Sequence, residues 1–401
     1  MSSNTLGRLH NISEFHIGYS DVVETYSDKS RILYHFSSLI DIPDDENIHG
    51  KITQSSSINR SFNQVQLLDK FGLYNSNDLS TYRGRLIKKT VYSGSQQKLS
   101  TESYLYNTNE AKNNYEISIL STSIGLSANR LYTTPCRLVE ESLVDQNQIV
   151  VTKSYSYNGK NLIAEKKTVN SNSDTLLLSY FYPFDNSGII VGVHNISDLI
   201  RLNIINEPVV IVKSIRKKNT KNIQVLSAIK YDYKNNNNQI WKRSLAELEI
   251  NSLLKFDNTV INNNFEVKEE YLDYDEYGNI IHLMKNGLEE YVFLWSYNGQ
   301  YPVAEIKGAT YAEVSQALGV TPKSLSKELT PKMDLINSLR TKLPKALINT
   351  YTYRIFVGVE SMIDPSGKTT TYQYDSSGRL WKIKDHRGRD IEVYQYNYLN
   401  K

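Results

Sequence analysis

A near-regular repeat of paired tyrosines is the feature that most restricts how this chain can fold. Near the end of the sequence, three pairs start 21 and then 22 residues apart: Tyr351/Tyr353, Tyr372/Tyr374 and Tyr394/Tyr396. Looser copies occur earlier, at Tyr155/Tyr157, Tyr180/Tyr182 and Tyr231/Tyr233. Because a period of about 20 to 50 residues is typical of arrays built from one supersecondary unit, we expect a repeated structure.

The residues between the pairs indicate that the repeating unit is a β-hairpin. In "YQYDSSGRLWKIKD", the pair is followed at once by Asp375 and, three residues later, by Gly378. Residues i and i+2 of a strand share a face, so both rings of a pair can stack on the neighbouring repeat. An aspartate can accept backbone N–H bonds at the head of a turn, and a glycine supplies the positive φ that closes it. One unit is therefore two strands and two turns.

Composition favours sheet and narrows the possible partners. The sequence has 30 Tyr against 10 Phe, and tyrosine is enriched in strands. Its net charge of +3 is the small difference between 46 basic and 43 acidic residues, so we predict no nucleic-acid partner. The single cysteine, Cys136, cannot form an internal disulfide and is expected to be a small, partly buried side chain. The first residues lack the basic and apolar regions of a signal peptide, so none is expected there, and the sequence has no apolar stretch long enough to cross a membrane.

One segment, residues 307–346, departs from the strand pattern and is expected to be helical. Thr310 and Glu313 are spaced as a capping box, and Gly319 can end the helix that they begin. Two further helices are expected to start at prolines that follow possible caps, Thr321–Pro322 and Thr330–Pro331. We predict that these helices lie on the sheet, either as a plug or as a cover over a sheet edge.

A search for chemistry finds no motif that would support catalysis. The seven histidines are scattered, and the sequence contains no HExxH, no Walker loop and no nucleophile elbow. Four acidic doublets could imitate a glycosidase pair: Asp44/Asp45, Glu140/Glu141, Glu269/Glu270 and Glu289/Glu290. Because neighbours in a strand point to opposite faces, we interpret them as solvated edge charges. We therefore predict a protein that is not an enzyme, with no catalytic, cofactor-binding or metal residues.

The C-terminal pattern "YxYDxxGRLxxIxDxxGxxxxxYxYNY", from Tyr372 to Tyr398, resembles the YD repeats of RHS (rearrangement hotspot) proteins. Four other blocks are similar to the long RHS-like surface or secreted proteins of Bacteroidetes: Tyr34 to Asp45, Asp78 to Leu86, Tyr180 to Asp185 and Trp295 to Val314. The resemblance touches most of the chain, although only the C-terminal repeats are individually specific.

The resemblance implies a mainly β fold. We expect an elongated, curved antiparallel sheet of YD-type hairpins, forming a shell or partial cocoon, with the small helical insert. The expected organisation is one continuous β body with three parts. Residues 1–306 would be a β-meander of divergent RHS-like repeats, residues 307–346 the helical insert, and residues 347–401 the regular YD repeats.

The resemblance also implies a structural function, as a section of a β-shell that in its family encloses a toxin or mediates surface contact. Toxin members end their shell with paired DPxG-type aspartates, whereas this sequence has one "DPSG", at Asp364, followed by an ordinary repeat. We therefore predict that Asp364 is a turn residue. The expected partners are a C-terminal toxin or other shell segments, from a longer chain or a neighbouring protein. The expected location is secreted or at the cell surface, with a cytoplasmic stage before export.

An alternative function is a carbohydrate-binding or adhesion module, with glycans as partners. Tyrosine rings can stack on sugars while their hydroxyls form hydrogen bonds. The candidate glycan-stacking residues are Tyr372, Tyr374, Tyr394 and Tyr396. In the competing interpretation, these rings stack on one another and line the inside of the sheet. Sequence alone leaves both interpretations open.

Overall fold

The computed structural model describes residues 19–42, 79–122, 125–185, 187–236, 238–249, 254–255 and 258–396. The doublet Asp44/Asp45, Tyr398 and parts of the first two RHS-like blocks lie outside these residues. By its internal contacts the chain divides into two compact units. We call them unit 1, residues 1–179 with 213–223, and unit 2, residues 180–212 with 224–401.

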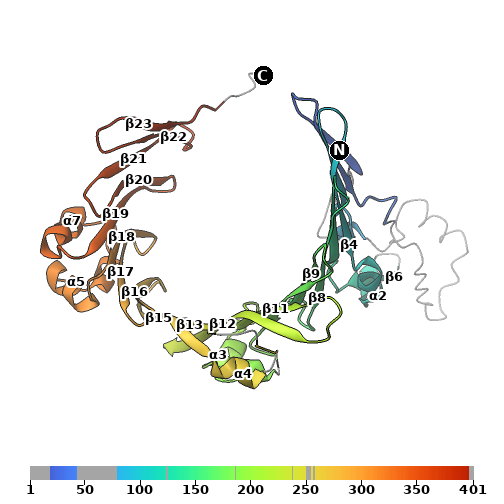
Figure 1. The fold of residues 1–401 in the computed structure, drawn as a ribbon, viewed down its shortest axis with the longest axis horizontal. Helices are drawn as coiled ribbons and strands as arrows, with labels where there is room; N and C mark the ends of the chain where they lie inside the picture. Colours follow the sequence, from blue (N-terminus) through green and yellow to red (C-terminus); the bar gives the residue numbers. More distant parts are fainter. Residues whose placement is uncertain are drawn as a thin grey trace, which may run out of the picture. The chain divides into compact units, whose positions relative to one another are not determined.

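Unit 1 contains an antiparallel meander in which each strand pairs with the next one in this order (Figure 1): β1 (Asp21–Thr25), β2 (Arg31–Phe36), β3 (Leu86–Tyr92), β4 (Lys98–Tyr106), β7 (Leu138–Asp145), β8 (Val150–Tyr157), β9 (Ile163–Val169) and β10 (Thr175–Phe181). Between β4 and β7 the chain forms helix α2 (Thr108–Asn113) and a separate hairpin, β5 (Tyr115–Thr122) with β6 (Gly125–Tyr132). A short 3₁₀ helix, η1 (Ser80–Tyr82), precedes β3. Cys136 is buried beside Tyr82 and Ala111, which agrees with the packing role expected for its side chain.

Unit 2 continues the antiparallel pattern with strands β12 (Ile223–Asn236), β13 (Gln239–Leu248), β14 (Leu254–Lys255), β15 (Phe265–Tyr274), β16 (Ile280–Lys285), β17 (Glu289–Ser296), β18 (Tyr301–Lys307), β19 (Leu347–Arg354), β20 (Gly358–Ile363), β21 (Thr369–Tyr374), β22 (Leu380–Lys384) and β23 (Asp390–Val393). Successive strands pair from β15 to β23, and β12, β13 and β15 are neighbours. Strand β11 (Val210–Arg216), like β10, contains residues at which the units divide.

The mainly β fold of antiparallel hairpins with a helical insert is confirmed. The prediction of strands alone before residue 307 is incomplete, because α2, η2 (Gly188–Ile190), α3 (Ile196–Arg201) and α4 (Asn258–Asn263) lie there. Each is six residues or shorter, too short to show a helical period in the sequence. The division at 306/307 and 346/347 stays a prediction.

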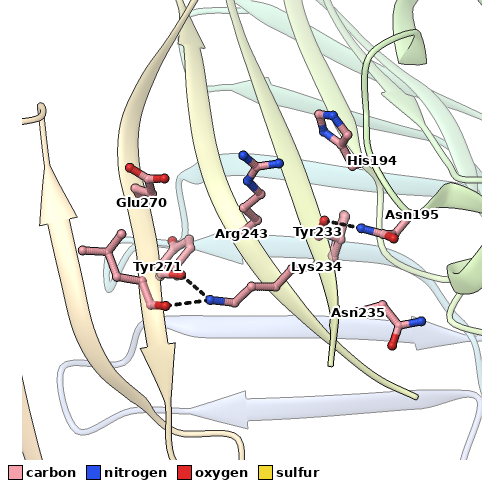
Figure 2. Close-up of a pocket in the computed structure, with 9 residues that line it drawn as sticks. His194, Asn195, Tyr233, Lys234, Asn235, Arg243, Glu270 and Tyr271 are labelled. Atoms are coloured by element: carbon pink, nitrogen blue, oxygen red, sulfur yellow. Dashed lines mark hydrogen bonds between the residues drawn. The ribbon is translucent and has the colours of Figure 1, made fainter. Parts of the chain in front are cut away.

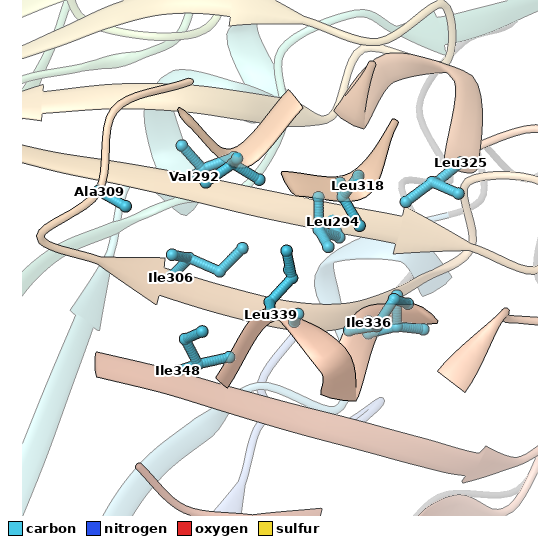
Figure 3. Packing of buried hydrophobic residues seen from close by; sticks show 12 residues of the cluster. Val292, Leu294, Ile306, Ala309, Leu318, Leu325, Ile336, Leu339 and Ile348 are labelled. Atoms are coloured by element: carbon cyan, nitrogen blue, oxygen red, sulfur yellow. The ribbon is translucent and has the colours of Figure 1, made fainter. Parts of the chain in front are cut away.

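The helical insert covers one stretch of the unit 2 sheet. Helices α5 (Tyr311–Leu318), α6 (Pro322–Leu325) and α7 (Met333–Lys342) lie between β18 and β19 in the chain. Figure 3 shows their apolar side chains against those of β17 to β19, where Leu294, Ile306 and Leu339 are fully buried. This cluster removes a large apolar area from water and is the main hydrophobic core of this part of the molecule.

The expected helix starts are correct for two of the three helices. Thr310 and Glu313 form a complete capping box, and Gly319 ends α5 with a φ of 73°. Helix α6 starts at Pro322, as predicted. The prediction that α7 starts at Pro331 is wrong. The carbonyl of Lys332 accepts the first helical hydrogen bond, from the N–H of Ile336, so the helix begins at Met333.

A second apolar cluster lies where η2, α3 and α4 pack in unit 2. Ile189, Leu199 and Ile261 contribute from these helices and are 0 to 1% exposed. They pack with valines of β11 and β12, among them Val212 and Val225. Short helices therefore cover two separate stretches of unit 2.

The side chain of Arg340 fastens α7 to the adjacent strands. Its guanidinium donates hydrogen bonds to the carbonyls of Ile348, Ile363 and Asp364, at 2.6 to 3.0 Å, and to the Thr350 hydroxyl at 3.1 Å. Burial lowers the pKa of Arg340, although Asp364 opposes that shift. The arginine is a structural clamp, because both of its terminal nitrogens donate to carbonyl and hydroxyl oxygens of the strands.

Candidate functional site

The second tyrosine of the best-formed repeat has a definite structural task. Tyr374 lies opposite Leu380 beside a shift in strand register, at which Trp381 is the extra residue of β22. Such a β-bulge interrupts the ladder of backbone hydrogen bonds. The Tyr374 hydroxyl reaches back to the preceding hairpin and donates a 2.8 Å hydrogen bond to the carbonyl of Val359.

The same arrangement continues in the next strand pair. Val359 itself lies opposite Tyr353 at a register shift. In the next strand pair, the carbonyl of Leu380 accepts a 2.7 Å hydrogen bond from the Tyr396 hydroxyl. In both strand pairs, the carbonyl beside the bulge accepts a hydrogen bond from a tyrosine that follows later in the chain. We call this contact a tyrosine rung. Phenylalanine could not donate this bond, which gives a physical reason for tyrosine at these positions.

Tyrosine rungs recur in both units. Further hydroxyl-to-carbonyl contacts at register shifts join Tyr106 to Leu86, Tyr157 to Leu138 and Tyr274 to Lys242, with lengths of 2.7 to 3.1 Å. At one position tryptophan replaces tyrosine, and Nε1 of Trp295 donates to the carbonyl of Ile280 at 2.9 Å. The rung is thus a general device of the repeat.

The four candidate glycan-stacking tyrosines differ in their surroundings. Tyr372 and Tyr374 are half-buried, whereas Tyr394 and Tyr396 are 38% and 40% exposed. Tyr374 and Tyr396 form rungs, and the Tyr394 hydroxyl donates to Glu392. Burial raises the pKa of Tyr374, and the bond to Glu392 raises that of Tyr394. Their role in glycan stacking stays a prediction.

The aspartates of the turns hold the backbone, as the sequence predicted. Asp385 accepts the N–H groups of Arg387 and Arg389 at 2.9 Å, and it pairs with the Arg389 guanidinium at 2.7 Å. These bonds lower the pKa of Asp385 to about 2, the backbone bond to Arg389 contributing most. Asp364 heads a turn of the same kind, with its carboxylate accepting the N–H of Lys368, and is a turn residue as expected.

An open pocket lies in unit 2, on strands β12, β13 and β15 and on the loop before α3 (Figure 2). Its volume is about 370 Å³. The lining residues are His194, Asn195, Tyr233, Lys234, Asn235, Arg243, Glu270, Tyr271 and Leu272. Register shifts make Arg243 and Leu272 the extra residues of their strands, so bulges set the direction of two side chains in the wall.

Hydrogen bonds fix several groups of this pocket. Asp232 accepts the backbone N–H of His194 at 2.6 Å and contacts its ring Nδ1 at 2.9 Å. The Lys234 ammonium donates to the carbonyls of Tyr271 and Leu272 at 2.7 and 2.9 Å. Burial lowers the pKa of Lys234. The wall therefore combines the fixed ammonium of Lys234 and the guanidinium of Arg243 with one acidic side chain, Glu270.

The acidic doublets do not all have the predicted role of solvated edge charges. Glu269 and Glu289 form cross-strand ion pairs with Lys285 and Lys307, at 3.1 and 2.9 Å. Glu290 instead has a side chain only 16% exposed, with Oε1 2.6 Å from Nε2 of His282 and 2.8 Å from the N–H of Tyr311. The interpretation as a solvated edge charge is wrong for Glu290, which joins β17 to the start of α5.

The described parts of the chain lack two further kinds of feature. Among these residues, no group of three or more His, Cys, Asp or Glu side chains is placed to hold a metal ion. Within the same ranges, no helix is long and apolar enough to cross a membrane.

Comparison with known families and structures bears on the repeat rather than on the pocket. Residues 359–390 match the model of the family described as RHS Repeat. The chain contains an RHS repeat. The matched residues run from β20 to the first residue of β23, so they include both partners of the rung between Tyr374 and Val359. No curated protein matches the chain. The narrower Bacteroidetes-type assignment stays a prediction.

Similar solved structures belong to bacterial toxin complexes. Two crystal structures of TcdB2-TccC3, one of them TcdB2-TccC3-TEV, share 7% and 8% identity with this chain, with TM-scores of 0.42 and 0.40. The Tc holotoxin pore of Photorhabdus luminescens shares 7% identity, with a TM-score of 0.25. The matches cover 89%, 89% and 90% of this chain. The chain spans only about a fifth of those chains, at 20%, 19% and 20% respectively.

Sequence reasoning missed the rungs and the pocket. A signal for the rungs was present, since each regular repeat has tyrosine rather than phenylalanine next to the turn. The pocket had no comparable signal, because its walls come from residues 194–195, 233–235, 243 and 270–272, which only strand pairing brings together.

Proposed function

We propose that this chain is a non-enzymatic structural protein, a section of an RHS-repeat β-shell. The observation that carries the proposal is the tyrosine rung, which recurs from Tyr106 to Tyr396. Where it occurs, a rung joins a hairpin to a preceding one without any reactive group. A structure in which each unit stabilises its neighbour suits an extended wall, because the pattern can be repeated without a limit on length.

The wall would enclose a toxin or another protein cargo. The RHS repeat supports this role by family, and the solved toxin complexes are proteins to which the chain is similar in part. The cargo and further wall segments would come from a longer chain or a neighbouring protein. Under this proposal the assembly acts outside the cell, as a secreted or surface-exposed protein after synthesis in the cytoplasm. Surface contact without cargo is the other outcome of the test below.

Small-angle X-ray scattering of the full chain tests the shell proposal. A compact chain of 401 residues would have a radius of gyration of about 21 Å. A section of curved wall has most of its mass far from its centre, so we expect a clearly larger value and a single extended particle. A value near that of a compact sphere, or the profile of two separate globules, would contradict the proposal.

Cargo enclosure is tested by protease protection. Expressed together with its neighbouring coding segments, the chain should shield a downstream protein from added protease. A point change that opens the wall should remove that protection. Equal digestion of the downstream protein with and without this chain would leave surface contact as the structural role.

Carbohydrate binding is a second candidate function, favoured by the exposed rings of Tyr394 and Tyr396. A glycan array should then give a hit that Tyr394→Ala removes. Tyr394→Phe is the matched control, because it keeps the ring that would stack on a sugar. An array without any hit, or a hit unaffected by Tyr394→Ala, would rule out this surface.

A further inference from the structure

We propose that the pocket of unit 2 binds a single carboxylated sugar of the uronic-acid class. The site is separate from the tyrosine surface of the C-terminal repeats, and the inference does not require the shell function. Its volume of about 370 Å³ is near the lower end of the range for small-molecule sites, which suits one monosaccharide.

Arg243 is the group placed to receive the carboxylate. It is the extra residue at the β12–β13 bulge, and its side chain is 50% exposed. Its nearest charged contact is Asp232, at 3.8 Å, which is too long for a hydrogen bond. Asp232 is already engaged by His194. The guanidinium of Arg243 therefore keeps donors for a bidentate contact with a carboxylate.

Lys234 adds positive charge that is fixed in place. Its ammonium is held by two backbone carbonyls and lies 5.0 Å from the centre of the Tyr274 ring. Carbonyls and a ring face carry no net charge, so they do not neutralise the ammonium as a hydrogen-bonded carboxylate would. Figure 2 shows this side chain and Arg243 entering the site from adjacent strands. An anion is thus favoured near these two residues.

Glu270 and Asn195 make a plain carboxylic acid a poor ligand but suit a sugar. The Asn195 amide donates to the carbonyl of Tyr233 at 2.7 Å, which leaves its own carbonyl oxygen as an acceptor. Glu270 contributes a carboxylate to the same wall, and carboxylates accept hydrogen bonds from hydroxyl groups. A ligand with one carboxylate and several hydroxyls satisfies donors and acceptors together.

The third element of the site is an apolar surface. Tyr271 and Leu272 line the pocket, and Leu272 is 37% exposed. The Tyr271 hydroxyl is bound to Glu269 at 2.8 Å, which fixes the position of the ring. A fixed aromatic ring beside an aliphatic side chain offers the C–H face of a pyranose a surface for stacking.

Ligand-observed NMR on the full chain tests the proposal with glucuronate and glucose as probes. Glucuronate should bind with a dissociation constant on the order of 1 mM, and glucose at least about tenfold more weakly. Binding of glucuronate should weaken at high salt, because the charges are partly exposed. Equal binding of the two sugars, or no saturable binding of glucuronate up to about 10 mM, would overturn the proposal.

Substitution at Arg243 locates the site. Arg243→Ala should weaken glucuronate binding about tenfold or more, since a charge-assisted bidentate contact is lost. Arg387→Ala is the matched control, because Arg387 lies on an exposed turn of the same unit. Circular dichroism should show both variants folded. Equal affinities of the two variants would overturn the assignment of Arg243.

Further probes separate a sugar site from a general anion site and from the tyrosine surface. Inorganic phosphate should not displace glucuronate at equal concentration, and effective displacement would overturn the sugar class. Tyr394→Ala should leave glucuronate binding unchanged. Loss of binding in that variant would place the sugar on the C-terminal repeats instead of in this pocket.

Discussion

In β17 to β19, Leu294, Ile306 and Ile348 are at most 1% exposed beneath the helical insert, whereas no side chain of β20 to β23 is buried. Both stretches are antiparallel hairpins in the same unit. The covered strands, β17 to β19, bury apolar side chains. The bare strands, β20 to β23, rely on tyrosine rungs and on the hydrogen bonds of turn aspartates. One sheet can therefore continue past its hydrophobic core when polar contacts link each hairpin to the next.

Removing apolar volume beneath the helices should have the largest effect on stability. Leu339 is 0% exposed, so Leu339→Ala should lower the free energy of unfolding by about 3 kcal/mol. Trp381→Ala, on a bare strand and 45% exposed, should cost clearly less despite removing a larger side chain. Denaturant unfolding followed by circular dichroism compares the two. A larger loss for Trp381→Ala would refute the contrast between the regions.

Removing the clamp between α7 and the strands should have the next largest effect. Arg340→Leu leaves the acceptors at Ile348, Ile363 and Asp364 without their donor, and each buried unsatisfied group is costly. We expect a loss of about 2 kcal/mol in the free energy of unfolding. Arg387→Leu is the control on an exposed turn. If both variants unfold at the same denaturant concentration, Arg340 is not a clamp.

Acid should loosen the bare strands in a defined pH range. The pKa of Asp385 is about 2 in the folded chain, below the value of about 3.9 for an unperturbed aspartate. Its stabilising effect is therefore complete above about pH 4 and is lost as the pH falls through about 2. The amide of Arg389 should exchange faster in that range. Asp385→Asn should make this exchange independent of pH after correction for intrinsic rates, and an unchanged pH profile would contradict this role.

The sequence predicted the elements whose signals are local. The spacing of Asp375 and Gly378 indicated the turn, and Thr310 with Glu313 indicated the start of α5. It did not predict the start of α7, because the first helical hydrogen bond rather than Pro331 decides it.

Features that depend on strand pairing could not be predicted. A bulge such as the one at Trp381 is defined only by the partner strand, so the acceptor carbonyls of the rungs were not visible in the sequence. The sequence also did not show that Arg243 and Glu270 share a pocket, because only the pairing of their strands brings them together. The role of Glu290 could not be predicted either, because it depends on the start of α5, where the Tyr311 N–H donates to this carboxylate.

The tyrosine rung also explains one glycine. A Cβ atom added to Gly358 would lie 2.4 Å from the Tyr374 hydroxyl oxygen, so only glycine leaves room for the ring to reach Val359. The hairpin turn and the rung of the next hairpin are thus matched to each other.

The central claim is that the second tyrosine of a repeat acts through its hydroxyl, and a pair of single-atom deletions tests it most directly. Tyr374→Phe removes the donor to Val359, and Tyr372→Phe removes a hydroxyl two residues away on the same strand. Hydrogen exchange of the β20 to β22 amides measures local stability. We predict a loss of about 1 kcal/mol for Tyr374→Phe and less than half of that for Tyr372→Phe. Equal losses, or a larger loss for Tyr372→Phe, would contradict the account.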